Sequence, residues 1–201
     1  IGIEHFLSLE SVNFNASNTI ETIDLSNLTS LKEITVHSNA VLSQLILPNI
    51  NSSVERILIH SNGYASTPAF NVEFLISGLS NQSGLKYLGL LDSEENIESL
   101  DLSKLTQLDD IWLSSSVLTS LDLSNNVNLK SIILSLNSAN SLNFSNNINL
   151  KELSISGSSL TSINMTKNNL LEDLIITGTL INNLDLSQCS SLINVDIENN
   201  N

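Results

Sequence analysis

Apolar residues recur along this chain with a period of 21 residues. Four consecutive segments can be written beneath one another without a gap, as LDDIWLSSSVLTSLDLSNNVN, LKSIILSLNSANSLNFSNNIN, LKELSISGSSLTSINMTKNNL and LEDLIITGTLINNLDLSQCSS. In each segment positions 1, 4 and 6 are Leu or Ile, and positions 11, 14 and 16 are also apolar. The spacing L-x-x-L-x-L favours a bend that enters a short strand over an amphipathic helix. The sequence therefore predicts coils of extended segments.

A single coil of this kind cannot fold alone. Burial of its six apolar side chains contributes roughly 9–18 kcal/mol, whereas ordering its residues costs about 30 kcal/mol. Stacked neighbours must supply the remaining burial and the backbone hydrogen-bond partners. Coil starts are predicted at residues 9, 31, 54, 85, 108, 129, 150, 171 and 192, so residues 1–201 are predicted to form a single domain of about nine coils.

One interval is longer than the others, from Val54 to Leu85. Thr67 followed by Pro68 is a helix-start signal, and apolar residues follow at helical spacing. This predicts a short helix over 68–79 on the convex side. A helix that covers a wider coil is favoured over a partner-docking element, because long repeats place helices there for packing.

Polar side chains recur at two further positions, and we call the residues at one position of successive coils a column. A turn that faces into a stack leaves backbone groups without water, and a repeated amide or hydroxyl can satisfy them. We interpret both columns as structural ladders, in preference to a ligand site or, for the thiol, a nucleophile. Column 9 includes Asn39, Asn62, Asn137 and Asn200, and column 19 includes Asn126, Asn147, Asn168 and Cys189.

These residues carry a family resemblance. The pattern L-x-x-L-x-L-x-x-N-x-L resembles the leucine-rich repeat, and its continuation from Leu118 to Asn126 and from Ile181 to Cys189 is similar to the nested 21-residue bacterial class called irreko. The resemblance implies an α/β-type solenoid, predominantly β, that is a right-handed superhelix with a parallel sheet on its concave face. It also implies a binding rather than catalytic role, in a bacterial secreted or cell-surface protein.

The two ends suggest a longer natural protein. The chain opens at Ile1 without Met or an apolar leader, which is typical of a mature form or an excised piece. A new coil begins before the chain stops at Asn201, and an uncovered coil would expose strand edges, so we expect the protein to continue. The longest apolar run is far too short for a bilayer, and no membrane insertion of this segment is expected.

Function is expected on the open face of the sheet, where columns 3, 5, 7 and 8 point away from the core. An exposed aromatic centre with a charged rim is typical of binding sites, so we predict a binding patch there. The alternative is that Trp112 lies flat over Gly89 and Ile133 to shield them. The apolar members of the patch are Leu58, Tyr87, Leu91, Trp112, Ile133 and Leu136, and its rim is His37, Arg56, His60, Asp92 and Asp110.

The chain is acidic, with 7 Lys and Arg against 21 Asp and Glu and a formal net charge of −14. This charge argues against nucleic acid and anionic membranes as partners. Acidic residues late on the open face leave a cationic partner open, namely Glu152, Asp173, Asp196 and Glu198. A Ca²⁺ ladder in column 15 is disfavoured, because the dense Gly-Asp loops of calcium-binding repeats are missing around Asp101, Asp122, Asn143, Asn164 and Asp185.

Catalysis has little support in the sequence. His37, His60, Asp92 and Ser114 can be combined into a triad on paper, but no nucleophile elbow, metal-ligand cluster or phosphate-binding loop is present. We predict no catalytic residue, no metal and no other cofactor. The leading prediction is protein recognition through the concave face. Carbohydrate binding in adhesion and a structural spacer are the alternatives, and the sequence leaves the oligomeric state open.

Overall fold

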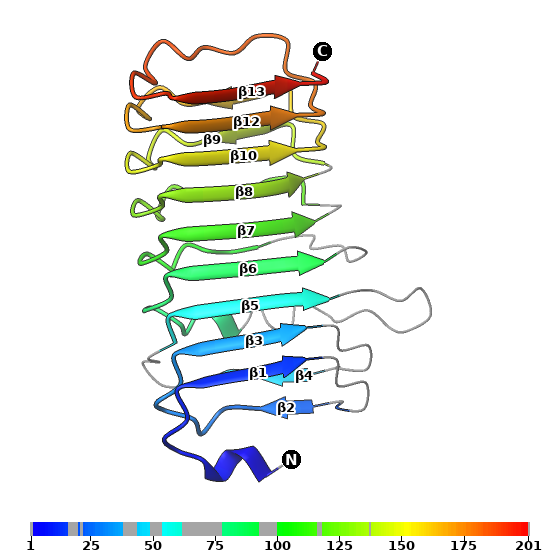
Figure 1. The fold of residues 1–201 in the computed structure, drawn as a ribbon, viewed down its shortest axis with the longest axis vertical. Helices are drawn as coiled ribbons and strands as arrows, with labels where there is room; N and C mark the ends of the chain where they lie inside the picture. Colours follow the sequence, from blue (N-terminus) through cyan, green and yellow to red (C-terminus); the bar gives the residue numbers. More distant parts are fainter. Residues whose placement is uncertain are drawn as a thin grey trace.

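The computed structural model describes residues 2–15, 20, 22–37, 44–48, 54–61, 78–92, 100–115, 118–136 and 138–200. The coils stack on one another, so that one strand of each lies beside its counterparts in a single parallel sheet (Figure 1). A 3-10 helix, η1 (Gly2–His5), precedes the first strand. The nine strands of this main sheet are, in spatial order, β1 (Ser11–Asn15), β3 (Glu33–His37), β5 (Arg56–Ser61), β6 (Tyr87–Asp92), β7 (Asp110–Ser115), β8 (Ser131–Leu136), β10 (Glu152–Ser156), β12 (Asp173–Thr177) and β13 (Asn194–Glu198).

The return segments of the coils contain little regular structure. Short parallel pairs form between β2 (Thr22–Asp24) and β4 (Gln44–Ile46), and between β9 (Ser141–Asn143) and β11 (Ser162–Asn164). The predominantly β solenoid predicted from the sequence is confirmed. It makes about seven turns rather than nine, since no return segment follows β13 and the longest coil is only partly described. The predicted helix over 68–79 lies outside the described residues, apart from helical backbone at Gly78 and Leu79.

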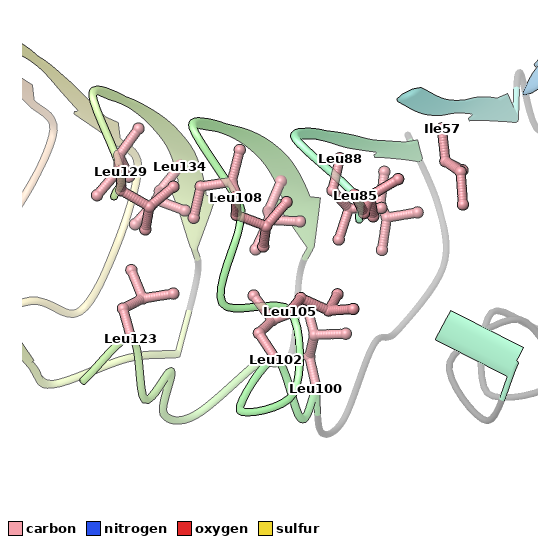
Figure 2. Packing of buried hydrophobic residues seen from close by; sticks show 14 of the residues in the cluster. Ile57, Leu85, Leu88, Leu100, Leu102, Leu105, Leu108, Leu123, Leu129 and Leu134 are labelled. Atoms are coloured by element: carbon pink, nitrogen blue, oxygen red, sulfur yellow. The ribbon is translucent and has the colours of Figure 1, made fainter. Parts of the chain in front are cut away.

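The core is a continuous column of aliphatic side chains. Residues of columns 1, 4 and 6 are at most 4% exposed in every coil from the one that starts at Leu31 to the one that starts at Leu171. Because each coil is narrow, the strand and the return segment bury their apolar side chains against each other. Figure 2 shows Leu85, Leu88, Leu108, Leu129 and Leu134 on the strand side and Leu100, Leu102, Leu105 and Leu123 on the return side.

Strand pairing keeps each column in register. Glu152 pairs with Asp173, 21 residues away, and Arg56 pairs with Tyr87, 31 residues away, so the extra length of the irregular coil is taken up outside the sheet. Before each strand, two successive N–H groups donate to one carbonyl of the preceding coil. The Lys151 and Glu152 amides, for example, donate to the Lys130 carbonyl over 2.8 and 3.0 Å.

The strands of the last three coils end at column 8 in left-handed backbone. Gly157, Gly178 and Asn199 have φ angles of 54°, 64° and 54°. Gly and Asn adopt this region more readily than other residues. In β6 and β8 the strand instead continues through column 8, at Asp92 and Leu136. Column 8 is therefore a turn position in some coils and a strand position in others.

Candidate functional site

The open face of the main sheet carries the columns that alternate with the core. In β10 the odd columns hold Glu152, Ser154 and Ser156, which are exposed or half-buried, while Leu153 and Ile155 are buried. Adjacent strands lie about 4.8 Å apart, so residues of one column are near neighbours. We call the following set the open-face patch: His37, Arg56, Leu58, His60, Tyr87, Leu91, Asp110, Trp112 and Ile133, which lie on β3, β5, β6, β7 and β8.

The pairing brings these predicted residues together in three rows. Across column 3, Arg56 pairs with Tyr87 and Tyr87 with Asp110. Across column 5 the order is Leu58, Gly89, Trp112 and Ile133, and across column 7 it is His37, His60, Leu91 and Ser114. Asp92 and Leu136 have described backbone, but their side chains lie outside the described part, so their place on this face stays a prediction.

Gly89 forms the floor of the patch. It is buried, and an added Cβ would come within 2.6 Å of Leu58 Cδ1 and 3.1 Å of the Tyr87 ring and hydroxyl. Two larger side chains therefore lean over Gly89 from the flanking rows. The absence of a side chain at column 5 of β6 allows this packing.

The Tyr87 ring is also held from its face. The Arg56 guanidinium carbon lies 3.6 Å from the ring centroid, which is a cation–π contact. Trp112, on the other side of Gly89, is 41% exposed. The patch thus combines a fixed tyrosine and arginine with an accessible tryptophan.

The polar rim differs between its two ends. His37 and His60 contact each other edge to face, with ring centroids 5.7 Å apart. At the other end, burial raises the pKa of Asp110 above its ordinary value, and the neighbouring Asp109 carboxylate raises the pKa further. The catalytic combination considered from the sequence is not assembled, because Leu91 lies between His60 and Ser114 in column 7.

Column 19 forms an amide ladder inside the stack. Each of its three asparagines is fully buried and donates from Nδ2 to two backbone carbonyls of the preceding coil. Asn126 donates to Leu102 and Leu105 over 3.0 and 2.9 Å. Asn147 and Asn168 repeat this arrangement one and two coils later.

The two members of column 19 outside this run differ in chemistry. Gln82 is fully buried, and its amide donates to the Pro48 carbonyl over 3.0 Å. The Cys189 thiol lies 4.0 Å from the Met165 carbonyl, and burial raises the pKa of this thiol. Within the described residues, the ladder therefore weakens at Cys189.

Column 9 is described only in its last coils. Asn200 accepts hydrogen bonds from the Thr179 amide and hydroxyl over 2.9 and 2.6 Å, and it donates to the Ile176 carbonyl over 2.8 Å. Thr179 and Ser158 accept from backbone amides two residues later. Asn39, Asn62 and Asn137 lie outside the described residues.

Column 15, considered as a calcium ladder, closes turns on the return side. In each case the side-chain oxygen accepts the backbone N–H two residues later, as between Asp122 and Ser124 over 2.9 Å. The same bond occurs at Asp24, Asp101, Asn143, Asn164 and Asp185. A hydrogen bond from the serine hydroxyl, followed by the backbone one, holds the pKa of Asp122 below its ordinary value.

A shallow depression of about 440 Å³ runs along this column, between Ser120, Asp122, Asn143 and Asn164. In the part of the chain that the structure describes, no three or more His, Cys, Asp or Glu residues are grouped to hold a metal ion. No described helix is long and apolar enough to span a bilayer.

Column 2 contains an alternation of charge that the sequence analysis missed. Ion pairs join Lys32 to Glu10, Lys86 to Glu55, Lys130 to Asp109 and Lys151 to Glu172, over 2.8–3.2 Å. All link neighbouring coils beside the main sheet. Because the pairs are largely solvent-exposed, each contributes at most about 1 kcal/mol. Reading column 2 as a column would have revealed the alternation.

Comparison with solved structures finds several related folds. The functional domain of InlJ from Listeria monocytogenes matches with a TM-score of 0.65 and 19% identity, over 100% of this chain and 51% of that one. An internalin C2 from the same species matches with a TM-score of 0.66 and 16% identity, over 96% of this chain and 83% of that one. A chain of the LRIM1/APL1C complex matches with a TM-score of 0.60 and 21% identity, over 99% of this chain and 36% of that one.

This chain thus spans about half of the InlJ structure that it matches. No protein-family profile matches the sequence, and no curated protein sequence is similar to it. At identities this low, the structural likeness shows the fold. The parallel register, the aliphatic columns and the similarity to internalins together establish that the chain is a leucine-rich-repeat solenoid.

Proposed function

We propose that this chain is a non-catalytic recognition module that binds a protein partner through the open-face patch. The observation that carries the proposal is the contiguous arrangement of Arg56, Tyr87 and Trp112 across β5, β6 and β7. Arginine, tyrosine and tryptophan are the residues that most often dominate the energetics of protein interfaces. Their gathering on a face that water would otherwise keep polar supports an interface.

The packing within the patch supports tight recognition. Tyr87 is held between the Arg56 guanidinium and the floor at Gly89, and Leu58 leans over the same glycine. Side chains that are already ordered lose little conformational entropy on binding. We infer that Trp112, the most accessible of the patch's large apolar side chains at 41% exposure, is the anchor that a partner covers.

Charge indicates the kind of partner. In column 3, beyond Tyr87, lie Asp110, Glu152 and Asp173, on a chain with a formal net charge of −14. A basic group beside the half-buried Asp110 would favour the charged carboxylate and reverse the increase in its pKa. The proposed partner segment therefore combines an aromatic or large aliphatic residue with Lys or Arg.

The likeness to the LRIM1/APL1C structure, which is itself a complex of proteins, supports a protein as the partner. The fold shared with internalins and the family resemblance of the sequence support a bacterial secreted or cell-surface setting, which we include in the proposal. Whether the sheet face is concave is part of the proposal as well.

A displayed library of random peptides is the experiment that tests this function. Selection on the chain is expected to enrich peptides with an apolar anchor and basic residues. For a synthetic peptide from the enriched pool, Trp112→Ala is expected to weaken binding roughly thirtyfold, the effect of losing an interface hot spot. Tyr87→Ala is expected to act in the same direction.

Ile175→Ala is the matched control, because Ile175 lies in the same column as Trp112 and is equally exposed at 41%. The control should leave the peptide affinity unchanged. Equal binding by wild type and both patch variants would refute the patch as the site. Signals on a glycan array that depend on Trp112 would favour carbohydrate binding, and failure of both screens would favour a structural spacer.

A further inference from the structure

His37 and His60 form a contact pair at one end of the open face. They are Cα partners on β3 and β5, their ring centroids lie 5.7 Å apart, and the rings meet at 69°. Adjacent strands are held about 4.8 Å apart by their ladder of hydrogen bonds. The sheet itself, rather than a loop, therefore fixes the separation of the two imidazoles.

The neighbours of the pair carry no charge. In column 7, Asn15 on β1 flanks His37, and Leu91 on β6 flanks His60. Both imidazoles are half-buried, so one side of each remains open to solvent. Among the described residues, no hydrogen bond or ion pair engages either imidazole, which leaves ring nitrogens available to a ligand.

We propose that His37 and His60 together chelate a divalent transition-metal ion such as Zn²⁺ or Cu²⁺. Neutral imidazole is a preferred ligand of both ions. A zinc ion binds imidazole nitrogen at about 2.0–2.1 Å, and rotation of two rings that already touch brings one nitrogen of each within reach of a shared ion. Water, or a group from a bound partner, fills the remaining coordination positions.

This site has no signature in the sequence, which led to the prediction of no metal. The two histidines are 23 residues apart and become neighbours only through the strand register. Because only two protein ligands contribute, the affinity is expected to be lower than that of a closed four-ligand zinc site. The site uses metal alone as its ligand, so it stands or falls independently of the proposed protein partner.

The test is a titration of the tag-free chain with zinc chloride above neutral pH, followed by NMR of the imidazole proton and nitrogen resonances. His37 and His60 are expected to shift together with one midpoint. Replacing either by alanine is expected to weaken binding on the order of a hundredfold, because chelation by two linked ligands is lost. His5→Ala is the matched control and should leave the midpoint unchanged.

Two results would overturn the proposal. One is an unchanged midpoint at the remaining imidazole of His37→Ala or His60→Ala. The other is a common midpoint for all three histidines, which would show adventitious surface binding only. If either alanine variant has a lower melting temperature, His37→Gln and His60→Gln keep a polar side chain of similar length without imidazole, and the same loss of zinc binding is expected.

Discussion

Asn147 lies in the middle of the amide ladder, and its replacement tests what that ladder contributes. Its Nδ2 donates to the Leu123 and Asn126 carbonyls over 3.1 and 2.9 Å. Asn168 donates to the carbonyl of Asn147 over 2.8 Å, and this bond survives a change of the Asn147 side chain. A substitution at Asn147 therefore removes two hydrogen bonds and leaves the rest of the ladder intact.

The magnitudes indicate that these two bonds do not decide the outcome. Their net contribution is about 1–3 kcal/mol. Both acceptor carbonyls also receive a backbone N–H, from Asn126 and Leu129, so neither is left unpaired. Against this gain, Asn147 Oδ1 is buried without a donor among the described residues. That burial costs about 1–3 kcal/mol, so the two effects nearly cancel.

Volume then determines stability at this position. Leucine occupies column 19 at Leu28 and Leu105, which are 1% and 0% exposed, so the site can hold a leucine. We expect Asn147→Leu to change the free energy of unfolding by less than about 1 kcal/mol. Asn147→Ala leaves a cavity and is expected to cost about 2 kcal/mol or more.

Urea denaturation followed by circular dichroism measures both effects, provided that the slope of unfolding free energy against urea is unchanged. Asn149→Ala is the control, because it removes a similar bond to the preceding coil, 3.0 Å from Asn149 Nδ2 to the Val127 carbonyl, at an exposed site. The control is expected to cost less than about 1 kcal/mol. A leucine variant as unstable as the alanine variant would show that the amide bonds outweigh the orphaned oxygen, and would refute the reasoning.

Three further substitutions test other parts of the structure. Gly89→Val should displace Leu58, whose Cδ1 would lie 2.6 Å from the first added carbon, and abolish peptide binding by the patch with a stability loss of about 1–3 kcal/mol; unchanged affinity would exclude Gly89 as the floor. Cys189→Asn should restore a donor to the Met165 carbonyl and stabilise by about 1 kcal/mol, seen as a higher urea midpoint. The pKa of Asp122 is depressed by its hydrogen bonds in the fold, so its contribution is present above the unfolded pKa and is lost as pH falls through the folded pKa. Asp122→Asn keeps the turn, as Asn143 shows, and melting curves against pH should therefore fall less steeply on acidification; an equal fall would assign the acid sensitivity elsewhere.

Much of the fold could be predicted because burial imposes a period. A narrow coil must place an aliphatic side chain at the same position in every turn, so the columns through Leu108, Leu129 and Leu150 can be recognised in one sequence. The register also follows, since a slip of one residue would expose all of these side chains. Variation in coil length does not obscure the register, because it falls outside the strands.

The candidate site could be predicted only as a set of neighbours. The columns indicated that Arg56, Tyr87 and Trp112 lie close together. They did not reveal that Arg56 lies over the face of Tyr87, or that Gly89 is covered by Leu58. Such contacts depend on side-chain rotamers, which no period specifies. The charge alternation of column 2 was available in the sequence and was missed because exposed columns impose no apolar pattern.

The separation of columns explains why the patch can be tested without unfolding the stack. Columns 1, 4 and 6 close every coil, whereas Trp112 projects from the opposite face and is already 41% exposed. Removing its side chain therefore takes away only part of the burial of a tryptophan and opens no cavity in the core, in contrast to a change at Ile111 or Leu113, which flank it and are 2% and 1% exposed. A loss of binding by Trp112→Ala with an unchanged melting temperature would thus report on the surface itself. The same reasoning applies to His37 and His60, whose strands are anchored by the buried residues between them.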